Sequence, residues 1–139
     1  ATKFQPAFAG DVATAIADAV DGNVRGGRVY ELGGPEVKTL RECLELMLDT
    51  IERRRVLVPV PFAAAAAAAT VLQYLPKPLL TPDQVRQLRV DNVVSAAAAA
   101  EGRTFQGLGI QPTSLEAVLP SYLGRYRPRG QFDSPRAAT

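Results

Sequence analysis

Three Ser/Thr-x-x-Glu/Gln segments constrain the fold most, because each one marks the residue at which a helix can begin. They run from Thr39 to Glu42, from Thr81 to Gln84 and from Thr113 to Glu116. In a capping box the first hydroxyl accepts a hydrogen bond from the amide three residues on, and the Glu or Gln side chain accepts from the first amide. Pro82 also suits the first helical position. The sequence therefore predicts helices beginning close to these three threonines.

A fourth helix is predicted near the start of the chain. Gly10-Asp11 precedes apolar residues at helical spacing, Val12, Ile16 and Val20. Asp11 is expected to be the N-cap, since its short carboxylate can accept from the free amides of a first turn. Asp21-Gly22 is expected to end the helix.

Alanine-rich runs predict two more helices, over 63–75 and 95–101. Short extended segments are predicted over 4–8, 28–32 and 56–60, bounded by Gly and Pro. The fold class is therefore α+β, with about five helices and a small two- or three-stranded sheet. We expect parallel strand pairing across helical connections.

Composition excludes several classes of function. The chain has no histidine, which removes the commonest general base and metal ligand, and its single cysteine, Cys43, cannot form an internal disulfide. Sixteen basic residues against 14 acidic ones are too balanced to indicate nucleic-acid binding. The most apolar stretch, 56–72, contains two prolines and is mostly alanine, so no transmembrane helix is expected. One reduced cysteine favours a cytoplasmic location.

Several segments, taken in order, resemble one known family. The first two are Gln5-Pro-Ala-Phe-Ala-Gly-Asp-Val-Ala13 and Val29-Tyr-Glu-Leu-Gly-Gly-Pro-Glu36; the others span Leu80–Leu88, Asp91–Ser95, Glu101–Thr104, Leu108–Glu116 and Pro120–Leu123. Together they resemble the C-terminal part of extended or atypical short-chain dehydrogenase/reductases, the NAD-dependent epimerase/dehydratase family. The likeness is strongest to its branch of epimerase-like accessory subunits of respiratory complex I, of alphaproteobacterial type.

This resemblance implies the C-terminal lobe of an extended Rossmann-type protein that lacks its dinucleotide-binding half. NAD(P) would belong to that missing N-terminal half, and no cofactor is expected on this chain. The resemblance also implies three parts. Residues 1–35 would normally flank the Rossmann sheet and, without it, be less ordered or paired with another chain. Residues 36–126 would form a helical lobe. The remaining residues, 127–139, are rich in Pro, Gly, Arg, Ser and Ala, and this composition predicts a disordered basic tail.

The residues themselves predict no catalytic, cofactor-binding or metal-binding group. No glycines have the G-x-G-x-x-G spacing of a pyrophosphate-binding turn, and Gly33-Gly34 is interpreted as an ordinary turn. Enzymes of the family use a Tyr and a Lys four residues apart, but no tyrosine here has that lysine. The tyrosines are Tyr30, Tyr74, Tyr122 and Tyr126.

Two functions remain open at this point. The first is a non-catalytic domain of a complex I-associated, NAD(P)-binding, epimerase-like protein, serving assembly or interaction. The alternative is the substrate-binding lobe of an active NAD(P)-dependent sugar-nucleotide epimerase, dehydratase or reductase. Expected partners are the N-terminal Rossmann half or another subunit, together with an anionic membrane surface, which would place the protein peripherally on the inner membrane. Candidate contacts for a partner or anionic lipid are Arg125, Arg127 and Arg129, although a solubilising tail is the simpler explanation of these arginines.

Overall fold

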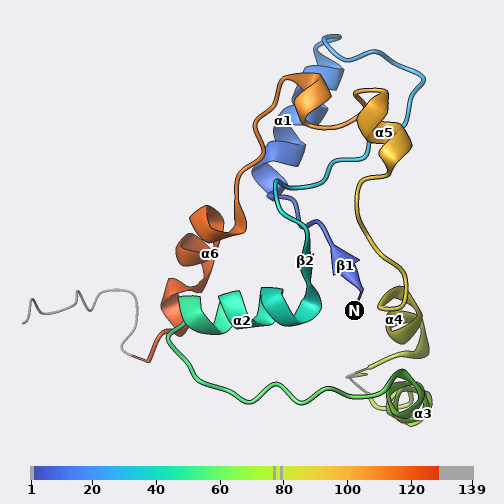
Figure 1. Ribbon diagram of the computed structural model, residues 1–139, viewed down its shortest axis with the longest axis vertical. Helices are drawn as coiled ribbons and strands as arrows, with labels where there is room; N and C mark the ends of the chain where they lie inside the picture. The colour runs from blue at the N-terminus through green and yellow to red at the C-terminus, as the bar shows by residue number, and fades with distance from the viewer. Residues whose placement is uncertain (1, 77, 79, 129–139) are drawn as a thin grey trace, which may run out of the picture.

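The computed structural model describes residues 2–76, 78 and 80–128. Figure 1 shows short helices joined by long connections, with a very small sheet near the middle of the molecule. The strands are β1 (Lys3–Phe4) and β2 (Lys38–Thr39). The helices are α1 (Ala9–Val20), α2 (Leu40–Thr50), α3 (Phe62–Leu72), α4 (Pro82–Gln87), α5 (Ala96–Ala100) and α6 (Leu115–Leu123), with 3-10 turns η1 (Gln106–Leu108) and η2 (Gly124–Tyr126).

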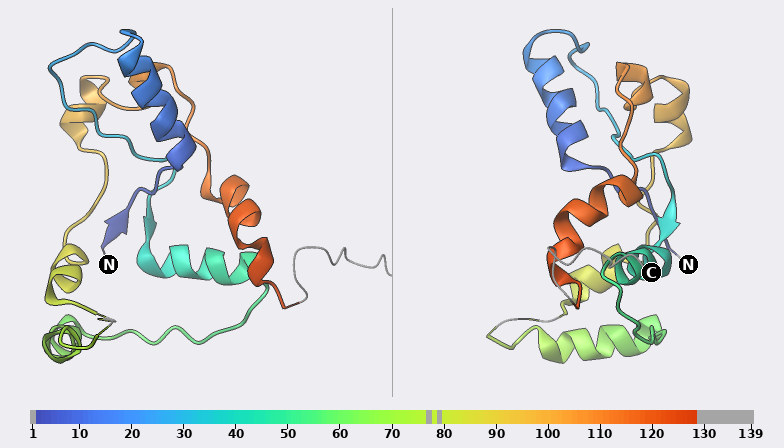
Figure 2. Two further views of the ribbon diagram at one scale, coloured as in Figure 1. Left: turned by 180° about the vertical axis from the view of Figure 1, so that it is seen from behind. Right: turned by 90° about the vertical axis from the view of Figure 1, so that its left-hand side faces the viewer.

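The elements gather into three groups along the long axis of the molecule. α1, α5 and η1 lie at one end, α2 and α6 lie beside the two strands, and α3 and α4 pack together at the other end (Figures 1 and 2). A long connection from α2 to α3 follows the lower edge in Figure 1. The α+β class predicted from the sequence is confirmed.

The sheet differs from the expected parallel arrangement, because β1 and β2 are antiparallel, with Lys3 opposite Thr39 and Phe4 opposite Lys38. A single parallel bridge joins Phe4 to Asn92. These pairings join three distant parts of the chain, around residues 3–4, 38–39 and 92. Because each strand has only two residues, the sheet does not form a layer of its own.

Two predicted strands are wrong. Residues 28–32 and 56–60 are extended but belong to no ladder among the described residues. In the first segment Glu31 donates its amide to the carbonyl of Arg103, and no strand runs alongside it. The second contains Pro59, which has no amide to donate, and Val56 is 90% exposed. A strand needs a partner, and neither segment has one here.

Two of the three capping boxes are confirmed. Thr39 donates its amide to Glu42 Oε2 at 2.6 Å and accepts from the Glu42 amide at 3.3 Å. Thr81 and Gln84 repeat this pattern, with Pro82 at the first helical position.

The other predicted helix starts need correction. Helix α6 is capped by Ser114, which accepts from the Ala117 amide at 3.3 Å, and not by Thr113. Helix α1 begins at Ala9, so Asp11 lies in its first turn and is not its N-cap. Both side chains predicted as caps are used elsewhere, as described below. The predicted end of α1 at Asp21-Gly22 is confirmed.

The core is small for a chain of this length. Its buried apolar residues are Ala15, Ala69, Val85, Ala98 and Phe105. Four of these five are small or β-branched, so Phe105 is the one large side chain among the described residues that is completely enclosed. Val85 is the buried residue of α4. The apolar stripe of α1, by contrast, lies largely open, since Ile16 and Val20 are exposed.

None of the described helices combines the length and the apolar character needed to cross a membrane.

Candidate functional site

Asp11 joins two parts of the chain that lie 102 residues apart. The Thr113 amide donates to Asp11 Oδ2 at 2.6 Å, and the Thr113 hydroxyl donates to Oδ1 at 3.0 Å. Both groups are partly buried. The carboxylate therefore connects the first turn of α1 to the residue that precedes the α6 cap, which explains why neither Asp11 nor Thr113 caps a helix.

Gln5 forms a second long-range clamp. Its side-chain nitrogen donates to the Gly34 carbonyl at 2.8 Å, and its side-chain oxygen accepts from the Val94 amide at 2.9 Å. Its own amide donates to the Asn92 carbonyl at 3.0 Å. Gln5 thus joins its own segment to two others, the one that carries Gly33-Gly34 and the one that contains Asn92 and Val94.

Gly34 is required by close packing and not, as predicted, by a turn. A Cβ on Gly34 would lie 1.9 Å from the Pro6 carbonyl oxygen, closer than any atoms can approach without displacement. The Gly34 amide also donates to the Gln5 carbonyl at 3.4 Å. The paired glycines therefore let two backbones pass each other at the Gln5 clamp.

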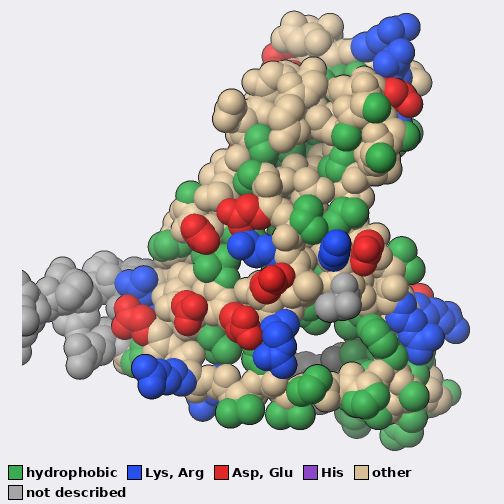
Figure 3. Space-filling model, in the orientation of Figure 1, with side chains coloured by type: hydrophobic (Ala, Val, Ile, Leu, Met, Phe, Trp, Pro, Cys, Tyr) green, Lys and Arg blue, Asp and Glu red, His purple; other side chains and the backbone are tan. Residues whose placement is uncertain are grey.

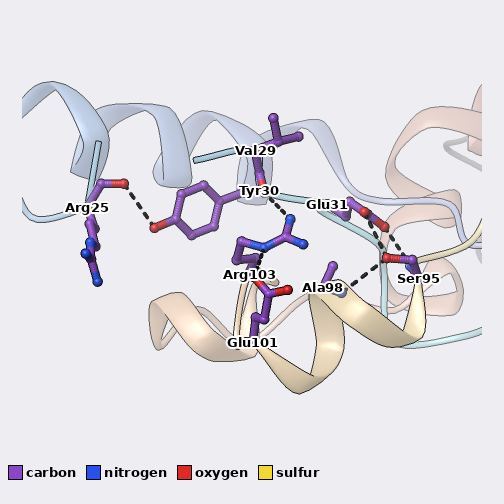
Figure 4. Close-up of polar contacts among 8 residues, drawn as sticks. All are labelled: Arg25, Val29, Tyr30, Glu31, Ser95, Ala98, Glu101 and Arg103. Carbon is purple, nitrogen blue, oxygen red and sulfur yellow. Dashed lines mark hydrogen bonds and ion pairs between the residues drawn. The ribbon is translucent and has the colours of Figure 1, made fainter. Parts of the chain in front are cut away.

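Glu31 forms the third clamp, shown in Figure 4. Its carboxylate accepts from the Ser95 amide at 2.7 Å and from the Ser95 hydroxyl at 2.9 Å, while Ser95 caps α5 through the Ala98 amide at 3.2 Å. The hydrogen bonds from Ser95 lower the pKa of Glu31 below its ordinary value. A carboxylate near a helix N-terminus is also stabilised by the positive end of the helix dipole.

Arg103 completes this cluster from the opposite side. Its guanidinium donates to Glu101 Oε2 at 2.8 Å and also to the Val29 carbonyl (Figure 4). Glu101 raises the pKa of Arg103, and Arg103 in turn lowers the pKa of Glu101. Each of these side chains is hydrogen-bonded within the same chain, so the geometry is that of a structural joint.

The predicted arginine contacts lie at the junction of α2 and α6. Arg127 donates through Nε to the Thr50 carbonyl at 3.0 Å and lies 3.6 Å from Glu52 Oε1. Arg53 donates from the other side to the Tyr126 carbonyl at 3.2 Å. Arg125 is exposed, and Arg129 lies outside the described residues.

A shallow hollow of about 440 Å³ opens at this junction. Its floor is apolar and its rim is basic; the lining residues are Met47, Ile51, Arg53, Leu123, Arg125, Tyr126 and Arg127. Two of the candidate contacts, Arg125 and Arg127, thus line one hollow, together with Arg53, which the sequence analysis did not single out. The guanidinium of Arg127 is already engaged with its own chain.

A second, more apolar groove of about 340 Å³ follows the open side of α1. It is lined by Ala15, Ile16, Ala19, Val20, Val24, Tyr30, Leu32 and Leu108. Val20 and Val29 are both exposed at this end of the molecule. The helical spacing of Ile16 and Val20 could have signalled this surface, although it could not show that the surface lies open.

Groups that could carry chemistry are not assembled in the part of the chain that the structure describes. No three metal-ligating side chains come together there. The Cys43 thiol is half-buried on α2, and this burial raises its pKa above the ordinary value. The Tyr30 hydroxyl donates to the Arg25 carbonyl at 3.2 Å.

Comparison with known proteins shows which class of protein this chain is similar to. No family model matches the chain. Two curated proteins that align with more than nine-tenths of it are both mitochondrial subunits of NADH:ubiquinone oxidoreductase. The chain is therefore homologous to a segment of subunits of this respiratory enzyme.

The particular relatives are one plant and one fungal protein. The chain is 39% identical over 139 residues to the NADH dehydrogenase (ubiquinone) 1 alpha subcomplex subunit 9 of Arabidopsis thaliana, covering 93% of this chain and 34% of that protein. It is 29% identical over 136 residues to the 40 kDa subunit of the Neurospora crassa enzyme, covering 97% and 35%. The chain thus spans about a third of the length of these relatives.

A third match is shorter. Cyclin-B1-2 of Oryza sativa subsp. japonica is 40% identical over 70 residues, which is 48% of this chain and 18% of that protein. Since it covers less than half of the chain, it does not alter the class indicated by the other two.

Proposed function

We propose that this chain is the non-catalytic C-terminal lobe of an epimerase-like accessory subunit of respiratory complex I, and that it acts in assembly or interaction. One observation carries the proposal. Nearly the whole chain aligns with a segment of two NADH:ubiquinone oxidoreductase subunits, one of them at 39% identity. The alphaproteobacterial origin and the membership of the epimerase/dehydratase family suggested by the sequence motifs are part of this proposal.

The clamps support a structural role. Asp11, Gln5 and Glu31 are polar residues of the motifs that carry the resemblance, and each is hydrogen-bonded to a distant segment of the chain. Polar motif residues that are fully used in joining segments are not available to bind or turn over a substrate. Their arrangement fits a lobe whose task is to keep a shape.

The open apolar face of α1 supports the need for a covering partner. Val20 is 80% exposed, and the groove beside it is lined mainly by aliphatic side chains. Contiguous apolar surface of this kind usually marks an interaction site. We propose that the dinucleotide-binding half of the same protein covers this face, in line with the resemblance, and that NAD(P) is bound by that half.

A truncation experiment in the source organism tests the proposal. A stop codon placed before this segment of the parent gene should lower the amount of assembled complex I on native gels and reduce NADH:ubiquinone oxidoreductase activity in membranes. A parent gene carrying Gln111→Ala, a change at an exposed position to which no contact is assigned, serves as a control for expression. If complex I assembles normally and a sugar-nucleotide reaction is lost instead, the substrate-binding alternative is correct and the proposal fails.

A further inference from the structure

The segment from residue 53 to residue 90 differs in charge from the rest of the chain. It contains six of the 16 basic residues and one of the 14 acidic ones, Asp83. The remaining residues therefore carry ten basic and thirteen acidic side chains, so a positive segment is attached to a negative body. This asymmetry is hidden in the overall charge of +2.

The same segment holds eight of the 16 large hydrophobic residues that are exposed among the described residues. In the connection before α3, Val56, Val58 and Val60 all point largely into solvent. In the last turn of α3 Val71 is 71% exposed, and Tyr74, two residues past the end of this helix, is 83% exposed. Figure 3 shows hydrophobic side chains along the lower edge of the molecule, with basic side chains toward both ends of that edge.

Helix α3 has no polar face. Its eleven residues are alanine, apart from Phe62, Thr70, Val71 and Leu72, and it packs against α4 through a surface that buries Ala69. A helix that is hydrophobic on all sides normally lies inside a large protein or within a membrane. At about 1.5 Å per residue it is about 16 Å long, far short of the about 30 Å of a bilayer core. It can therefore lie along a membrane but cannot cross one.

Basic side chains flank this apolar edge. Arg54 and Arg55 are exposed immediately before it. Arg86 is exposed on the adjacent α4, and Arg89 is exposed just after the end of that helix. The Arg89 guanidinium lies over the Phe62 ring, 5.4 Å from its centroid, which places a positive charge at the start of α3. None of these four arginines is paired with a carboxylate of the described residues.

We propose that this edge, comprising the connection 53–61, α3 and α4, rests on an anionic membrane surface, with the apolar side chains in the headgroup layer. Apolar residues bounded by arginine and by aromatic side chains are the pattern expected at a bilayer interface. The four exposed arginines that have no carboxylate partner among the described residues favour an anionic surface as the occupant of this edge. The proposed surface does not include the α1 groove, and it shares only Arg53 with the hollow at Arg125 and Arg127. The proposal can fail while the proposed function stands.

The chain provides a clean optical test because it contains no tryptophan. Val71→Trp places a single reporter on the proposed membrane edge, and Val20→Trp places one on α1 at a similar exposure, 80% against 71%. Both variants are mixed with phosphatidylcholine vesicles with and without phosphatidylglycerol. We expect the Val71→Trp emission to shift to the blue and to be quenched by nitroxide lipids, and the Val20→Trp emission to remain unchanged. Circular dichroism checks that both variants keep the wild-type helix content.

Charge is tested by matched pairs of substitutions and vesicle co-sedimentation. Each basic residue close to an anionic surface contributes about a fivefold rise in partitioning. Arg54→Gln with Arg55→Gln should therefore lower binding to phosphatidylglycerol vesicles by about thirtyfold, whereas Arg25→Gln with Arg28→Gln should leave it unchanged.

Three outcomes would overturn the proposal. The first is equal binding to vesicles with and without phosphatidylglycerol. The second is an equal loss of vesicle binding in the two double arginine variants. The third is a blue shift of the Val71→Trp emission that appears without vesicles as the protein concentration rises. The last result would assign the edge to self-association. None of these outcomes bears on the complex I truncation experiment, so the two proposals fail separately.

Discussion

The carboxylate of Asp11 and the backbone and hydroxyl of Thr113 meet in a two-pronged hydrogen bond across 102 residues of sequence, at 2.6 and 3.0 Å. This contact ties the start of α1 to the start of α6. It is the clearest case in which a polar residue of the N-terminal motif serves the tertiary structure of the lobe.

Asp11→Asn should destabilise the chain. The amide keeps the shape of the side chain but presents an N–H to one of the two Thr113 donors, and a hydrogen bond to a charged group contributes about 1.5–3 kcal/mol. We expect the free energy of unfolding in urea to fall by about 2 kcal/mol. Asp21→Asn, at the C-terminal end of α1, is the control and should cause no loss. Equal stability of Asp11→Asn and the wild type would show that this contact contributes nothing.

Gly34→Ala should be more damaging than its size suggests. The added methyl group would meet the Pro6 carbonyl oxygen at 1.9 Å, so two backbones must separate at the Gln5 clamp. We expect a loss of about 3 kcal/mol, at the upper end of overpacking costs. Gly26→Ala is the matched control, because its Cβ would meet no atom within 4 Å and its φ is unstrained. If urea denaturation gives the same midpoint for both variants, the close approach at Gly34 is not real.

Glu31 should make stability depend on pH. Its folded-state pKa is lowered by the hydrogen bonds from Ser95, so its contribution is present above the unfolded-state pKa and is lost as the pH falls through the folded-state pKa. We expect wild type to be more stable than Glu31→Gln at pH 7, and the difference to shrink below about pH 4, near the ordinary glutamate pKa. Urea midpoints across this range provide the measurement. A difference that stays constant with pH would mean that the carboxylate is not held by Ser95.

Arg127→Gln should loosen the end of α2 against α6. It removes the hydrogen bond to the Thr50 carbonyl and the charge facing Glu52. Because the Arg127 side chain is partly exposed, we expect a fall of only about 0.5 kcal/mol in the free energy of unfolding. Arg125→Gln at the same hollow should cause none. If only Arg125→Gln reduces stability, the roles assigned to the two arginines are reversed.

Local patterns in the sequence predicted local structure well. The capping boxes at Thr39 and Thr81 depend on groups three residues apart, so the sequence contains all the information needed to place them. The alanine runs likewise predicted α3 and α5. The third box failed because two adjacent residues, Thr113 and Ser114, can both cap, and the carboxylate that takes Thr113 comes from the other end of the chain.

Contacts over long sequence separations could not be predicted. Residues 28–32 and 56–60 have the composition of strands, yet a strand forms only where another backbone is available to pair with it. Gln5, Glu31 and residues 92–95 all stand in motifs that mark the family resemblance. Nothing in the sequence, however, indicates that these motifs are hydrogen-bonded to one another. The contact role of Arg125 and Arg127 stays a prediction, and Arg53 could not be assigned to the same hollow without the fold.

Hydrogen exchange of this chain, alone and joined to the residues that precede it in the parent protein, tests the central account most directly. If the lobe lacks its covering half, the amides of residues 1–35, and those of α1 above all, should exchange faster in the isolated chain and become protected in the parent. Amides of α4, which belongs to the opposite end of the molecule, should change little. Full protection of residues 1–35 in the isolated, monomeric chain, with no further change in the parent, would contradict the account.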